Sequence, residues 1–213
     1  MRGYIIQGEV ASRHFVRMTT DIPRPRGRPR RFDPDQAVAT AQRLFQARGY
    51  DAVSVADLTE ALGINPPSFY AAFGSKAGLY ARILSRYAGV DALPLESLLR
   101  PDRPVAASLA ALLEEAARRY AANPAAAGCL VVEGARCDDR EAREAAHAYQ
   151  SAGEDAIRRY IAARHPDEAE RLTDFVSTTL NGLSAKARSG HGVERLMATA
   201  RLAGLALAQA LPD

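Results

Sequence analysis

Two short helices, each with its own start and stop signals, are encoded within residues 54–76. Ser54 is a favourable N-cap for the first helix, and Gly63 suits the left-handed conformation that ends a helix. A second helix is expected to begin at once, because Asn65 is a good N-cap and Pro66 fits the first helical position, where no N–H is needed. This order of signals predicts a helix-turn-helix, which can place its second helix in the major groove of DNA.

Longer helices are predicted on both sides of this motif. Asp33 and Pro34 open one that Gly49 ends. The helix after the motif has a stripe of apolar residues at helical spacing that is expected to be buried. The stripe consists of Leu79, Ile83, Tyr87 and Val90. These flanking helices should supply the core that the two short helices lack, which leaves the end of the second short helix free to face a ligand.

A series of short motifs follows the same order. It consists of Gly27-Arg28-Pro29-Arg30, Ala41-Gln42-Arg43-Leu44-Phe45, Gly49-Tyr50, Ser54-Val55-Ala56-Asp57-Leu58, Leu62-Gly63-Ile64, Ser68-Phe69-Tyr70, Phe73 and Ser75-Lys76. Over about residues 27–90 the chain therefore resembles the N-terminal domain of TetR/AcrR-type transcriptional regulators. The later segment 128–130, Gly-Cys-Leu, is similar to one branch of that family.

The resemblance assigns DNA contacts to particular residues. Positions 65–68 would enter the major groove, while Tyr70 would contact one phosphate and Lys76, with the backbone at Ser75, another. The alternative for Tyr70 is a core aromatic beside Phe69. The two prolines offer only shape and apolar contact to a base. The candidate DNA-binding residues are Arg26, Arg28, Arg30, Ser54, Asn65, Pro66, Pro67, Ser68, Tyr70, Ser75 and Lys76.

Positive charge is concentrated at the start of the chain. The net charge of the whole chain is +3, whereas residues 1–31 hold eight arginines against Glu9 and Asp21, a charge of +6. Within this arm the Arg-, Gly- and Pro-rich run 25–31 is like an AT-hook, whose arginines enter a narrow A-T minor groove. The alternative is a flexible tether with solvated charges. Met18 is a plausible start of translation.

Composition and motifs exclude several classes. The chain has no apolar run long enough to span a bilayer and no visible signal peptide, and its two cysteines are too few for a secreted disulfide scaffold, so we expect a cytoplasmic protein without membrane contact. Its four histidines stand alone, and neither a nucleophile elbow nor a phosphate-binding loop is present. We expect no catalytic residue, metal or cofactor.

The rest of the chain is predicted to be all-helical. From about residue 94 it consists of long helices, of which the last carries small residues that allow close helix packing. By resemblance, the last two helices would pair with those of a second copy in a four-helix bundle; the alternative is an internal core. We thus expect an all-α protein with a disordered basic arm at 1–31, a helix-turn-helix DNA-binding domain at 32–90 and a ligand-binding and dimerisation domain at 91–213.

A ligand site is expected among the central helices of that last domain. Glu133 lies on a short apolar helix and needs a partner, either Arg136 or a polar inducer. Cys129 and Cys137 are interpreted as packing residues; the alternative is a redox sensor in which Arg136 lowers the pKa of a thiol. The candidate ligand-binding residues are Tyr120, Cys129, Glu133, Tyr149 and Thr179.

Together these features predict a homodimeric, ligand-responsive repressor. Two recognition helices about 34–36 Å apart would read a palindromic operator on double-stranded DNA. A small-molecule inducer would move the fourth helix and spoil that spacing. The alternatives are a sequence-tolerant architectural DNA-binding protein led by the basic arm, and an all-helical enzyme, for which no set of residues argues.

Overall fold

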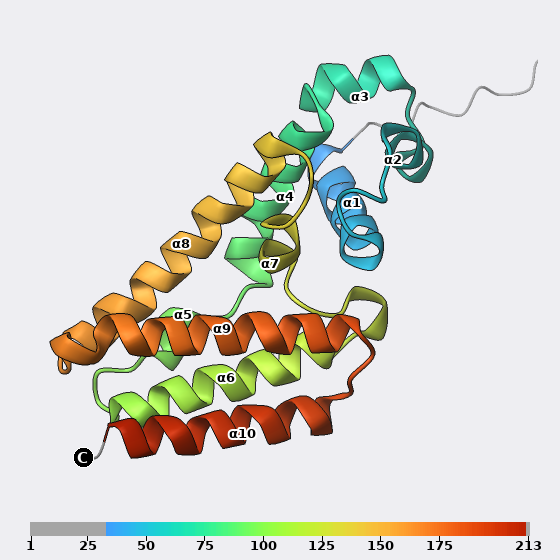
Figure 1. Cartoon of the computed structure of the whole chain (residues 1–213). Coiled ribbons are helices and arrows are strands. Elements are labelled where there is room, and N and C mark those ends of the chain that lie inside the picture. Colours follow the sequence, from blue (N-terminus) through green and yellow to red (C-terminus); the bar gives the residue numbers. More distant parts are fainter. Residues whose placement is uncertain (1–32, 212–213) are drawn as a thin grey trace, which may run out of the picture. The chain divides into compact units, whose positions relative to one another are not determined.

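The structure, a computed structural model, describes residues 33–211 of the chain. Every regular element in this range is a helix, as expected (Figure 1). The predicted basic arm, with Arg26, Arg28 and Arg30, lies outside the described residues. None of the helices between residues 33 and 211 is both long and apolar enough to cross a bilayer.

The helix-turn-helix lies where its capping residues and glycine stops predict it. Side chains of Asp33, Ser54, Asn65 and Ser75 accept backbone hydrogen bonds at the start of the first four helices. Gly63 ends the second helix in the left-handed conformation, with a φ of 65°. The four helices are α1 (Pro34–Arg48), α2 (Val55–Leu62), α3 (Pro66–Phe73) and α4 (Lys76–Val90).

The helices that follow pack mainly against one another. Helices α6, α9 and α10 lie side by side, and α8 begins beside α4 and α7 and ends beside α9 (Figure 1). The elements are α5 (Leu95–Leu98), α6 (Val105–Ala121), η1 (Pro124–Ala126), α7 (Leu130–Gly134), α8 (Arg140–Ala162), η2 (Pro166–Glu168), α9 (Ala169–Arg188) and α10 (Val193–Ala210).

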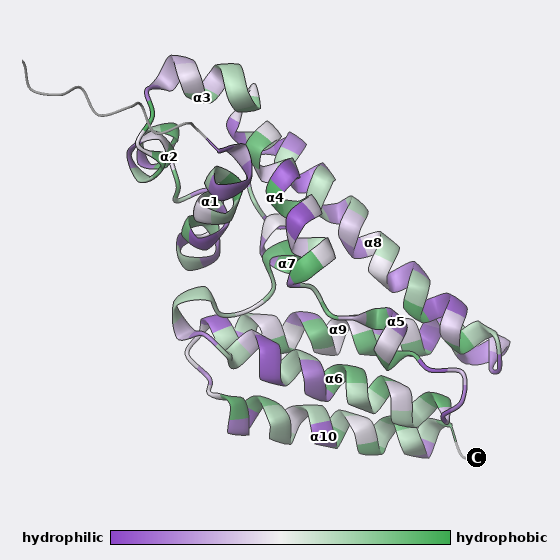
Figure 2. Cartoon of the chain, turned by 180° about the vertical axis from the view of Figure 1, so that it is seen from behind, coloured by the Kyte–Doolittle hydropathy of each residue, from purple (hydrophilic) through white to green (hydrophobic). Residues whose placement is uncertain are grey.

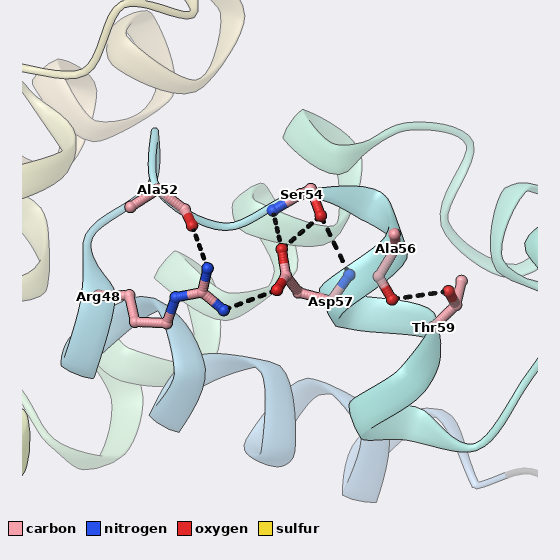
Figure 3. Close-up of polar contacts among 6 residues, drawn as sticks. All are labelled: Arg48, Ala52, Ser54, Ala56, Asp57 and Thr59. Carbon is pink, nitrogen blue, oxygen red and sulfur yellow. Dashed lines mark hydrogen bonds and ion pairs between the residues drawn. The ribbon is translucent and has the colours of Figure 1, made fainter.

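The start of α2 shows how local chemistry fixes a helix end (Figure 3). The backbone N–H of Asp57 donates to the Ser54 hydroxyl at 3.1 Å, and the Ser54 N–H donates to the Asp57 carboxylate at 2.7 Å. Arg48 joins this capping box to the end of α1, because its guanidinium bonds Asp57 at 2.8 Å and the Ala52 carbonyl at 2.6 Å. Hydrogen bonds from Ser54, and then from Arg48, hold the pKa of Asp57 well below its usual range.

Two hydrophobic cores fill the described chain. The first joins α1–α4 to α7 and the first turns of α8, while the second joins α6, the end of α8, α9 and α10. Residues 33–213 form one compact unit. Val90 was expected in the buried stripe of α4, but it is 65% exposed, because α4 ends at this residue and its last turn projects beyond the core.

The small residues of α10 face α6 within the same chain. Ala200 and Ala203 are buried, and a Cβ added at Gly204 would lie 3.0 Å from the Cβ of Ala110 on α6. The expectation that this stripe meets a second copy is therefore wrong: it allows a close approach inside the monomer. The opposite face of α10 remains apolar, with Leu202 and Leu205 about 70% exposed, and green apolar positions follow α10 in Figure 2.

Candidate nucleic-acid interface and ligand cavity

Helix α3 is anchored by one face and presents the other to solvent. Phe69 and Phe73 are buried, and their rings pack against each other at 5.4 Å between centroids. Asn65 accepts the backbone N–H of Ser68 at 2.9 Å and so fixes the first turn. The four residues expected to enter the groove, at positions 65–68, are all exposed. A short helix held at its base by two aromatic rings can therefore present its N-terminal turn to DNA.

Tyr70 belongs to the exposed face of this helix. Tyr70 is 51% exposed, and its ring packs edge-to-face with that of Phe69, at 5.5 Å between centroids. The interpretation of Tyr70 as a core residue is wrong, because successive helix positions place Phe69 inside and Tyr70 outside. Its contact with a phosphate stays a prediction.

The start of α4 offers backbone donors beside a restrained lysine. Ser75 caps this helix by accepting the N–H of Gly78 at 2.8 Å. Lys76 does not extend freely into solvent, since its Nζ lies 4.0 Å from the centroid of the Tyr50 ring. Burial lowers the pKa of Lys76, although the nearby carboxylates of Asp51 and Asp139 act in the opposite direction. Ser54, another candidate contact, uses its hydroxyl in the capping box of α2.

The loop after α1 is bonded to the start of α8. The Tyr50 hydroxyl donates to the Asp139 carboxylate at 3.1 Å, and the Asp138 N–H donates to the Asp51 carboxylate at 3.1 Å. We call these four residues the α1–α8 latch. Burial, followed by the Asp139 carboxylate, raises the pKa of Tyr50 far above its usual range. The latch was not predicted, because the residues that each hydrogen bond joins are almost 90 positions apart in the sequence.

Arg188, at the end of α9, forms a second link between distant segments. Its guanidinium lies 3.1 Å from the Glu133 carboxylate on α7 and donates to the Gln46 carbonyl of α1 at 3.0 Å and to the Ala127 carbonyl at 3.4 Å. The ion-pair partner of Glu133 is therefore Arg188 and not Arg136. Sequence spacing suggested Arg136 because it lies three residues away, whereas the fold brings Arg188, at the end of α9, beside Glu133.

A cavity of about 580 Å³ lies among α4, α5, α6, α7, α8 and α9. Three of the predicted ligand-binding residues, Tyr120, Cys129 and Tyr149, line it. Glu133 does not, because it is paired with Arg188, and neither does Thr179, whose hydroxyl donates to the Phe175 carbonyl of its own helix at 2.8 Å. The positions of both residues outside the cavity share a cause: helical spacing predicted the helix but not the face that meets the cavity.

Two phenols and a thiol meet at one wall of this cavity. Tyr87 donates its hydroxyl to the Cys129 sulfur at 3.7 Å, and Tyr120 lies in the same cluster. Burial raises the pKa of both Tyr87 and Tyr120 well above the usual range, so both hydroxyls stay protonated at neutral pH. The role of Tyr87 was missed, since a buried stripe residue carries no sign that its hydroxyl reaches a cavity.

The two cysteines differ in their surroundings. Cys137 is buried in the turn between α7 and α8, where burial raises the pKa of its thiol. This is opposite to the lowering by Arg136 that a redox sensor would require, so packing is the better interpretation of Cys137. Cys129 is partly exposed and faces the cavity. No cluster of side chains within residues 33–211 has the composition and geometry to hold a metal.

Comparison with known proteins decides the family. Residues 37–83 match the family model described as bacterial regulatory proteins, tetR family. The chain is 55% identical over 187 residues to the HTH-type transcriptional repressor BdcR of Escherichia coli K12, a match that covers 88% of this chain and 95% of BdcR. The chain belongs to the TetR family. It is thus a DNA-binding transcriptional regulator, and its all-helical fold with an N-terminal helix-turn-helix is the TetR fold.

Other TetR relatives support the same assignment. The HTH-type transcriptional repressor ComR of the same bacterium is 30% identical over 84% of this chain and 93% of its own length. Among solved structures, a cysteine variant of the TetR family regulator CifR, complexed with 26bp double-strand operator DNA, has a TM-score of 0.73 and 36% identity. That match covers 84% of this chain and 99% of the CifR chain.

Proposed function

We propose that this regulator is a repressor that binds a palindromic operator as a homodimer and releases it when a small molecule enters the cavity. The observation that carries the proposal is α3, whose exposed first turn stands on a buried pair of phenylalanines. The names of BdcR and ComR, both repressors, and the operator complex of CifR support it. Binding to operator DNA also implies a cytoplasmic location.

The proposed DNA contacts are of two kinds, contacts to the bases and contacts to the phosphates. Residues 65–68 would face the bases, with Pro66 and Pro67 offering shape and apolar contact, for example to a thymine methyl. Tyr70, the backbone at Ser75 and Lys76 would contact phosphates. Because Lys76 lies over Tyr50 in the described chain, a phosphate contact would require its Nζ to leave that ring.

The homodimer would form on the outer face of α9 and α10. Phe175 on α9 is 37% exposed, and Leu202 and Leu205, which lie on the same side of α10, are 69% and 70% exposed. Large apolar side chains gathered on one face of a soluble protein favour an interface. With a two-fold axis through this face, the same surface of both protomers would form the interface. The two recognition helices would then lie about one turn of DNA apart. In this proposal, residues 32–90 form the DNA-binding domain, and residues 91–213 form the ligand-binding and dimerisation domain.

The inducer would be a largely apolar, uncharged or cationic molecule. Among the described residues that line the 580 Å³ cavity, the charged side chains are Glu96 and Glu154, and no arginine, lysine or histidine is present. An anion would therefore meet repulsion from these carboxylates without a compensating positive charge. The phenols of Tyr87, Tyr120 and Tyr149 offer aromatic surface and polar groups, as ligand cavities of this size commonly do.

Two links would carry ligand binding to the DNA-binding helices. Tyr87 places α4 itself in the cavity wall. Cys129 begins the segment that leads to Glu133, which Arg188 ties to the end of α1. A ligand that displaces Cys129 or Tyr87 would change the position of α1 and α4, and a coupling free energy of about 1–3 kcal/mol would lower operator affinity about 5- to 150-fold.

Selection of bound duplexes from a random library tests this function. We expect an enriched palindrome whose half-sites are centred about 10 base pairs apart or a multiple of that spacing. Enrichment of A-T-rich duplexes without a palindrome would instead favour the sequence-tolerant architectural protein. Enrichment of a single half-site would remove the dimer from the proposal while leaving recognition by α3 in place.

A further inference from the structure

A second cavity, of about 430 Å³, lies between the DNA-binding helices and the rest of the described chain. Helix α1 contributes Gln42 and Arg43, α4 contributes Arg86, and the end of α6 contributes Arg119. Among the described residues that line this cavity, Asp91 supplies the single carboxylate, so the lining carries two net positive charges. Its charge is thus opposite to that of the larger cavity.

The inner wall of this cavity is a fixed polar network. The Gln42 side chain is buried, with 4% exposure, and its amide donates to the Asp91 carboxylate at 2.7 Å. Arg86 donates to the Gln42 amide oxygen at 2.7 Å and to Asp91 at 3.1 Å. One arginine is therefore held in place by two groups that are themselves bonded, which reduces the entropy lost when it binds a ligand.

Most donors of these three guanidinium groups have no partner within the part of the chain that the structure describes. Each arginine has five N–H donors. Within the described residues, Arg43 makes one bond, to the Thr40 hydroxyl, and Arg86 makes the two already named. Arg119 makes two, to the Glu115 carboxylate at 2.6 Å and the Ala92 carbonyl at 3.0 Å. Among the residues from 33 to 211, five of the fifteen donors thus have a partner, and no acidic partner of Arg43 lies in that range.

We propose that this cavity is a second effector site, which binds a small molecule carrying a compact dianion, either a phosphate or a dicarboxylate. Guanidinium groups match both anions through paired N–H donors. The cavity volume lies within the range of small-molecule sites. The chemistry separates this ligand from the inducer, because the larger cavity has carboxylates where this one has guanidinium groups.

An anion in this cavity would act directly on the DNA-binding helices. It would contact α1 through Arg43, α4 through Arg86 and α6 through Arg119, and so hold these three helices in their present arrangement. Tyr87 and Tyr120 line both cavities and form the wall between them. Occupation of one cavity is therefore expected to alter the affinity of the other, and the two effectors should influence each other equally.

Thermal unfolding of the full chain in inorganic phosphate tests the site, with sodium chloride added to keep ionic strength constant. For a Kd of about 1 mM, phosphate at about 20 mM should raise the Tm by about 4–7 °C. Arg43→Gln and Arg119→Gln should each remove most of this rise. Arg158→Gln, which removes an equal charge from a surface ion pair on α8, should leave it unchanged.

Further results decide the proposal. Malonate in place of phosphate distinguishes the dicarboxylate from the phosphate class, and an Arg43-dependent shift with either anion supports the site. A phosphate shift that survives both arginine variants but is lost in Lys76→Gln would place the anion at the DNA interface and overturn the proposal. An unchanged Tm of the unaltered protein would mean that no anion binds and would overturn the proposal. A rise of equal size in every variant would mean an adventitious ion only. A lower salt dependence of operator binding in Arg43→Gln would make Arg43 a DNA contact and also overturn the proposal.

Discussion

The helix-turn-helix and the helices behind it are organised by interactions of different range. In α1–α4, every helix begins at a side chain that accepts a backbone N–H two or three residues ahead. In α6, α9 and α10, no side chain caps the first turn, and burial against neighbouring helices orders them instead. The helix starts of the first region can therefore be predicted from adjacent residues. In the second region, tertiary packing decides which face of each helix is buried.

The largest expected effect comes from substitutions on the two faces of α10, one packed on α6 and one exposed. Ala203→Arg places a charge in the contact with α6 and should destabilise the fold by about 3–5 kcal/mol, because the charge would be buried without a partner. Leu205→Arg lies on the exposed face and should keep the helical circular dichroism spectrum while yielding monomers in sedimentation. A folded Ala203→Arg monomer together with a dimeric Leu205→Arg protein would reverse the assignment of the faces.

Adjacent residues of α3 separate stability from recognition. Phe69→Ala should lower the free energy of unfolding by about 3–5 kcal/mol, since its ring is fully buried. Tyr70→Ala should change it by less than about 0.5 kcal/mol, because the side chain is largely exposed. Denaturation and operator titration of both variants measure this contrast. Unchanged operator affinity in Tyr70→Ala would remove Tyr70 from the interface.

The ion pair between Arg188 and Glu133 is expected to affect the release of the operator by the ligand and not the affinity for the operator itself. Arg188→Gln removes the ion pair with Glu133 while keeping a donor for the Gln46 carbonyl. The variant should bind the operator nearly as tightly but lose most of the ligand effect, about 5- to 150-fold in affinity. Glu133→Gln is the matched partner and should behave alike. Loss of operator binding in both variants, without a ligand effect, would make the pair purely structural.

The smallest expected effect concerns Lys76. Lys76→Gln should weaken binding to all duplexes about equally and reduce the slope of log affinity against log salt by nearly one, because one counterion-releasing contact is lost. Tyr50→Phe serves as a control, since it keeps the ring beneath Lys76 but removes the hydroxyl bond to Asp139. A slope that Lys76→Gln does not change would mean that this lysine stays on the Tyr50 ring in the DNA complex.

These contrasts explain what the sequence does and does not reveal. Caps such as Ser54 and Asn65 are predictable because the donor lies within three residues. The partner of Glu133 was not, because Arg188 follows it by 55 positions and is brought beside it only by the fold. The same holds for the 580 Å³ cavity: of its lining residues, Tyr120, Cys129 and Tyr149 were predicted from the sequence but Tyr87 was not. The family resemblance supplied the function that no spacing rule encodes.

Recognition of one operator through α3 is tested most directly by comparing the selected palindrome with a scrambled duplex of equal composition. At a fixed salt concentration near 0.15 M, we predict that the palindrome is bound at least about 10³-fold more tightly, as expected for a dedicated operator-binding protein. The Tyr70→Ala variant should lose affinity for both duplexes. Equal affinity of the unaltered protein for the two sequences would contradict the repressor and favour a protein that binds DNA through charge and shape alone.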